Sequence, residues 1–98
     1  MAKQKVNAGT YTITVKGQDG KEYKAELKEP NRSIKEMALG YSAPIIGEPK
    51  YIRAGEIILL GCWVSGDEVI KTDEYLLAGA AMSALGLLDI AEASLKKN

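Results

Sequence analysis

The sequence predicts a single small α+β domain over residues 1–98, in which an N-terminal β-hairpin is followed by three to four helices. Two observations support this prediction. Before residue 30 apolar and polar residues alternate, as in strands, and after residue 30 apolar residues recur every three or four positions, as in helices. Of the 98 residues, 46% are hydrophobic and 27% charged, which is ordinary for a globular domain. Residues 1–9 lack either pattern, and we expect them to form a flexible tail.

The predicted hairpin pairs residues 11–15 with residues 22–28. Both segments alternate apolar with polar residues, and β-branched and aromatic residues dominate the first. Asp19-Gly20 between them is a strong turn signal, because glycine accepts positive φ. A two-stranded hairpin is marginal alone, so we expect it to lie on an apolar layer or to join another sheet. The apolar face of the second strand consists of Tyr23, Ala25 and Leu27.

A first helix is predicted over residues 33–39. Asn31 or Ser33 can cap it, since a short side-chain oxygen satisfies free backbone N–H groups at a helix start. Ser33 with Glu36 also fits the capping-box spacing. The residues expected to end this helix are Gly40 and Pro44.

A second helix is predicted after the loop of residues 42–49, with Pro49 as its first residue. Lys50, Arg53 and Glu56 recur every three residues, and apolar residues fill the rest, which favours a largely buried helix. The alternative is a buried strand over residues 57–64, a continuous apolar run rich in β-forming residues.

A turn is predicted at residues 65–68, and a third helix is predicted after it with Thr72 as the N-cap. Its first residues are Asp73 and Glu74, whose negative charges are stabilised by the positive N-terminal end of a helix. Its apolar residues step by four and three in a heptad-like seam, which we call the α-seam. Whether the helix continues unbroken through Gly86 is left open, because a mid-helix glycine costs about 1 kcal/mol relative to alanine. The α-seam consists of Leu77, Ala81, Ala84, Leu88, Ala91 and Leu95.

The composition disfavours several classes of function. The net charge is zero, whereas nucleic-acid-binding proteins usually carry a basic excess. The chain has no histidine, the commonest general base and transition-metal ligand, so we expect no catalytic residues, no metal and no cofactor. The densest carboxylates, at positions 67, 68, 73 and 74, lack the spacing of a calcium loop. The single cysteine, Cys62, is expected to be a small buried apolar residue.

No segment resembles a secretory signal or a membrane span, so we expect a soluble, cytoplasmic protein with no membrane partner. For protein partners, the candidate binding residues are Trp63, Ile90 and Leu95. Trp63 can be a binding hot spot, although a core position is favoured in so small a domain. Beyond Gly86 the sequence is more mixed, and we expect that part of the last helix to face partners.

Four short motifs occur in a set order. Residues 28–32 read K-E-P-N-R, residues 56–63 read E-I-I-L-L-G-C-W, residues 66–70 read G-D-E-V-I and residues 73–76 read D-E-Y-L. This order is similar to that of small phage and prophage proteins of the tail assembly chaperone type. The resemblance implies a non-enzymatic role in which the protein binds the tape measure protein and helps to recruit tail tube subunits. The alternative is a virion component, such as a head or tail connector subunit, whose hairpin adds to a neighbour's sheet.

Overall fold

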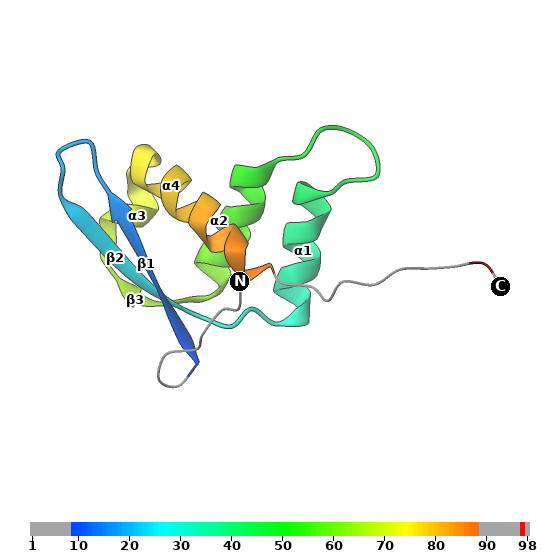
Figure 1. Ribbon diagram of the computed structural model, residues 1–98, viewed down its shortest axis with the longest axis horizontal. Coiled ribbons are helices and arrows are strands. Elements are labelled where there is room, and N and C mark those ends of the chain that lie inside the picture. The colour runs from blue at the N-terminus through cyan, green and yellow to red at the C-terminus, as the bar shows by residue number, and fades with distance from the viewer. Residues whose placement is uncertain (1–8, 89–96, 98) are drawn as a thin grey trace.

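The computed structural model describes residues 9–88 and residue 97, and it confirms the α+β class with an N-terminal hairpin (Figure 1). The elements follow one another as strands β1 (Thr10–Lys16) and β2 (Glu22–Lys28), helices α1 (Arg32–Ser42) and α2 (Tyr51–Gly61), strand β3 (Trp63–Gly66), helices α3 (Val69–Thr72) and α4 (Glu74–Ala84), and a 3₁₀ turn η1 (Leu85–Leu87).

The three strands form one antiparallel sheet in the order β1-β2-β3. The β1–β2 register runs without interruption from Thr10 opposite Lys28 to Lys16 opposite Glu22. The connecting loop spans residues 17–21, and Gly20 adopts a φ of 86°, as the Asp-Gly signal predicts. The predicted apolar face of β2 is confirmed, because Ala25 and Leu27 are buried and Tyr23 is half-buried.

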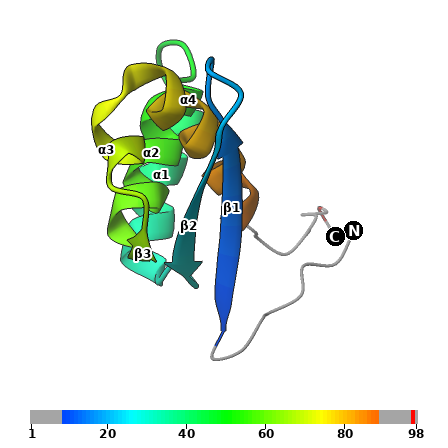
Figure 2. The ribbon, with the colours of Figure 1, turned by 90° about the vertical axis from the view of Figure 1, so that its left-hand side faces the viewer.

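The helices gather on one face of the sheet, and no described helix or strand covers the other face (Figure 2). The hairpin therefore lies on an apolar layer, as expected for a pair of strands that is marginal alone. Helices α2 and α4 form the centre of that layer. The buried core draws on the sheet and on every helix, with Ile13, Val15, Leu27, Ala38, Ile58, Leu59, Cys62, Ile70, Leu76 and Ala80 among its members.

Helix α1 begins as expected and ends later. Asn31 is the N-cap, and its Oδ1 accepts a hydrogen bond from the backbone N–H of Ile34 at 2.9 Å. Ser33 lies inside the helix, so the predicted capping box with Ser33 as cap is wrong. The helix also passes through Gly40 to Ser42, because an exposed glycine weakens a helix by only about 1 kcal/mol and does not end it.

The apolar run after residue 56 is divided between a helix and a strand. Helix α2 continues to Gly61, which confirms the favoured reading over residues 57–61. Trp63 then starts β3, which pairs with β2 and extends to Gly66, so the turn predicted at residues 65–68 begins two residues too early. Pro49 precedes the N-cap, Lys50, and its prediction as the first helical residue is wrong.

The start of α4 differs from the prediction by one residue. Asp73 is the N-cap, and its Oδ1 accepts hydrogen bonds from the backbone N–H groups of Tyr75 at 2.9 Å and Leu76 at 3.2 Å. Thr72 belongs to the short helix α3, where its hydroxyl donates to the carbonyl oxygen of Val69 at 3.3 Å. The predicted Thr72 cap is therefore wrong, because its hydroxyl is engaged by the preceding turn.

The α-seam faces inward where the structure describes it. Ala81 and Ala84 are buried, and Leu77 and Leu88 are half-buried against the core. The regular helix ends at Ala84 and passes into η1, so it does not run unbroken through Gly86. The seam residues Ala91 and Leu95, and residues 1–8 of the expected tail, lie outside the described residues.

Candidate partner-binding surface

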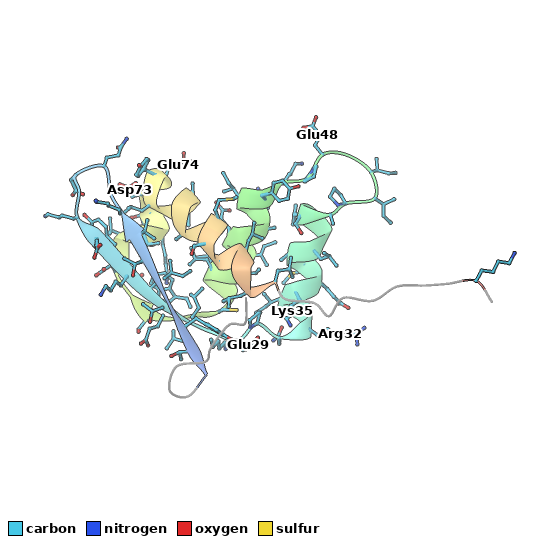
Figure 3. All side chains as sticks on the ribbon, viewed as in Figure 1. Glu29, Arg32, Lys35, Glu48, Asp73 and Glu74 are labelled. Carbon is cyan, nitrogen blue, oxygen red and sulfur yellow. The ribbon has the colours of Figure 1, made fainter. Side chains whose placement is uncertain are left out.

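Three of the four acidic residues near the start of α4, Asp67, Glu68 and Asp73, have structural partners. Asp67 accepts a hydrogen bond from the backbone N–H of Lys24 at 2.8 Å and thereby joins the end of β3 to β2. Asp73 caps α4, and Glu68 lies 3.4 Å from the ammonium group of Lys71. Asp73 and Glu74 occupy the same end of the molecule in Figure 3. Within the described part of the chain, no group of three or more His, Cys, Asp and Glu side chains could hold a metal ion.

Cys62 lies at the C-terminal end of α2 and is completely buried, which confirms its expected packing role. Burial raises the pKa of its thiol, because the charged thiolate loses its hydration. The raised pKa keeps the thiol protonated at neutral pH and makes it a weak nucleophile. Its position therefore serves packing between α2 and the sheet.

Of the three residues predicted to bind partners, the structure describes Trp63. Trp63 starts β3, packs half-buried against the core, and has the Lys71 ammonium nitrogen 4.3 Å from the centroid of its ring. Trp63 therefore lies at the edge of the core and not within it. Ile90 and Leu95 lie outside the described residues.

A different apolar feature projects from the molecule, on the loop between α1 and α2 (Figure 1). Ile45 is fully exposed, and Ile46 is 89% exposed. The loop is closed at its base, because the backbone N–H of Lys50 donates to the carbonyl oxygen of Tyr41 at 2.7 Å. Gly47 follows the two isoleucines with a φ of 95°, which turns the chain back. The base therefore holds two branched apolar side chains out into solvent.

Further exposed apolar residues lie on the helices at both ends of this loop. A shallow hollow of about 400 Å³ lies on the α1 side, and one of about 500 Å³ lies on the α2 side, where Met82 of α4 also contributes. The Arg53 guanidinium stacks 5.7 Å from the centroid of the Tyr41 ring and links the two helices. We call this region the loop surface; its members are Leu39, Tyr41, Ile45, Ile46, Tyr51 and Ile52.

The loop surface is suited to binding another protein. Moving an isoleucine side chain from water into an apolar contact contributes about 1.5–3 kcal/mol, so Ile45 and Ile46 provide a large gain to any partner that covers them. Contiguous exposed apolar residues on a small protein mark interaction sites. From the sequence, residues 42–49 were predicted only to be a loop that connects two helices. The feature that could have indicated a binding surface is the pair of adjacent isoleucines in Pro44-Ile45-Ile46-Gly47, within a loop otherwise rich in proline and glycine.

The fold and the loop surface define a small α+β protein with a candidate protein-binding site. No model of a known protein family matches the chain, and neither the curated proteins nor the solved structures show a significant match. None of the described helices is long and apolar enough to cross a membrane.

Proposed function

We propose that this protein is a non-enzymatic assembly factor that works by binding other proteins, of the phage tail assembly chaperone type. The observation that supports binding most directly is the pair Ile45 and Ile46, held outside the folded body on a loop closed at its base. The tail-assembly part of the proposal rests on the order of the four sequence motifs.

The mechanism is shielding. The loop surface covers apolar, aggregation-prone segments of a partner until that partner assembles. The partners implied by the resemblance are the tape measure protein and tail tube subunits, in the cytoplasm of a host cell. A net charge of zero fits an apolar contact better than a contact to nucleic acid.

A second candidate function is a structural role in the virion, as a head or tail connector subunit. The observation that favours it is the sheet, in which β1 is an edge strand of seven residues. Mass spectrometry of purified virions separates the two functions, because a connector stays in the particle and a chaperone is released from it.

A pull-down from induced or infected cells tests the proposal. The variant Ile45→Thr/Ile46→Thr removes apolar surface at positions that contact little of the fold, so its melting temperature should match that of the wild type. Val64→Thr is the matched control, since it makes the same kind of change at an exposed position on β3.

We expect the wild type and Val64→Thr to recover a tail protein, and the double isoleucine variant to lose it. Equal recovery by the double variant would refute the loop surface as the binding site. Failure of the wild type to recover any tail component would refute the assembly role itself.

A further inference from the structure

Strand β1 directs part of its backbone away from the sheet. In β2, the backbone groups of Lys24 bond to Asp67, and the N–H of Lys28 donates to the carbonyl oxygen of Cys62, so both residues face the β3 side. Backbone direction alternates along a strand, and the odd-numbered residues of β2 therefore bond to β1. Their partners are odd-numbered as well, which leaves the N–H and C=O groups of Thr12 and Thr14 directed at the outer edge.

The two edges of the sheet differ in how they are protected. Strand β3 has four residues and an irregular register opposite Glu26 and Leu27, and both features discourage pairing with another chain. Strand β1 has seven residues in unbroken register, no proline and a single charge, Lys16, at its end. No described strand pairs with β1 on the side to which Thr12 and Thr14 direct their backbone groups. An edge of this kind is a template for a further strand.

The sequence of β1 is complementary to itself in the antiparallel direction. With a two-fold axis at Ile13, Thr12 lies opposite Thr14 of the second copy, and Tyr11 lies opposite Val15. Threonine pairs and aromatic–β-branched pairs are both favourable cross-strand neighbours. Lys16 lies opposite Thr10, so the pairing brings no like charges together.

The helix layer leaves room for this pairing. A hollow of about 520 Å³ lies between β1 and α4, lined by Val15, Tyr75, Gly79 and Met82. No residue of β2 lines it, so it opens at the outer edge of β1. Tyr75 and Met82 are each about half exposed there. In the register centred on Ile13, Val15 of each copy lies beside Tyr11 of the other on the helix side, where Tyr11 stays packed on its own core and donates to Glu29 at 2.7 Å.

We propose that two copies of this chain pair through β1 about a two-fold axis at Ile13, forming a continuous six-stranded sheet. The inference is independent of the assembly role, since it concerns the edge of the sheet and not the loop surface.

Charge substitutions on the open face of the sheet test the register. Thr12 and Thr14 are exposed, and their neighbours on β2 are Glu26 and Lys24. In Thr12→Lys/Thr14→Lys, two lysine–lysine pairs face each other across the axis. In Thr12→Lys/Thr14→Glu, the same two pairs become lysine–glutamate. The mass of the full chain is measured by light scattering and sedimentation from low micromolar to about 0.5 mM.

We expect a dimer for the wild type. The Lys/Lys variant should raise the dimer dissociation constant about tenfold or more, and the Lys/Glu variant should restore dimerisation, while both keep the circular dichroism of the wild type. A wild type that stays monomeric over the whole range would overturn the proposal. Equal dimerisation of the two variants would do so too, because the pairing would then not bring position 12 opposite position 14.

Discussion

Gly55 of α2 and Ala81 of α4 meet backbone to backbone, so closely that a methyl group on Gly55 would overlap the carbonyl group of Ala81. Both residues are buried at the centre of the helix layer. The absence of a side chain at Gly55 therefore sets the distance between the two helices at the centre of the layer. It also explains why α4 has small residues on this face, at Ala80, Ala81 and Ala84.

The Gly55→Ala substitution should destabilise the protein strongly. The added methyl group meets main-chain atoms of α4, which cannot move without separating the two helices. We expect a loss of about 3 kcal/mol or more in the free energy of unfolding, measured by urea denaturation.

Gly40→Ala is the matched control, because Gly40 lies within α1 and a Cβ there meets no atom within 4 Å. Alanine favours a helix over glycine by about 1 kcal/mol, so this variant should be more stable than the wild type. Equal effects of the two substitutions would contradict the close contact between Gly55 and Ala81.

The Ala81→Leu substitution tests the same interface from α4. Ala81 is fully buried, so a leucine there overpacks the contact with α2. We expect a loss of about 1–3 kcal/mol, seen as a lower urea midpoint. Met82→Leu serves as the control, because Met82 is the next residue in α4 and is exposed. This substitution should change the urea midpoint little. A stable Ala81→Leu variant would show that α4 can shift away from α2.

The N-terminal end of α4 depends on Asp73 and not on Thr72. Asp73→Ala removes the acceptor of two backbone N–H groups, those of Tyr75 and Leu76, and should cost about 1 kcal/mol. Asp73→Asn keeps a capping oxygen and should lose less. Thr72→Ala should have a smaller effect than Asp73→Ala in thermal unfolding, and the reverse order would contradict the observed cap.

Stability should fall at alkaline pH because of Cys62. Its pKa is raised in the folded protein above the unfolded value of about 8.5, so the folded state holds the proton more tightly. The stabilisation is fully present below about pH 8.5 and is lost as the pH rises through the folded pKa. Urea denaturation between about pH 8 and 9.5 should show a declining free energy of unfolding in the wild type.

Cys62→Ala should flatten this decline, since it removes the titrating thiol. The pKa of Tyr23 is raised as well, chiefly by desolvation and by its hydrogen bond with Asp19, but its ionisation begins at higher pH. Tyr23→Phe should therefore leave the decline below about pH 9.5 in place. A decline that persists unchanged in Cys62→Ala would point to another group.

Local sequence patterns were enough to predict those strands and helices in which apolar residues recur at a regular spacing. The alternation around Ala25 and Leu27 predicted the hairpin and its buried face. Asn31 and the spacing after it predicted α1, and the α-seam predicted that Ala81 and Ala84 face the core. In each case the signal lies within a few residues, because strands and helices repeat over two or about 3.6 positions.

The loop surface could not be predicted in this way. Proline and glycine mark residues 42–49 as a loop, but they do not say whether Ile45 and Ile46 fold back on the core or stand in solvent. The tertiary structure decides this through the hydrogen bond from Lys50 to Tyr41, which closes the base of the loop and directs its tip away from the helices.

The apolar run after Glu56 shows the same division between sequence and tertiary structure. The polar residues at every third position before the run favour a helix, but the run itself is continuously apolar, so no local signal places a boundary within it. The boundary falls at Cys62 because β2 has a second edge with backbone groups to satisfy. Lys28 donates to the Cys62 carbonyl, and Lys24 accepts from the backbone N–H of Asp67. The chain between these two points becomes β3, because buried backbone groups need hydrogen-bond partners and this pairing supplies them to β2.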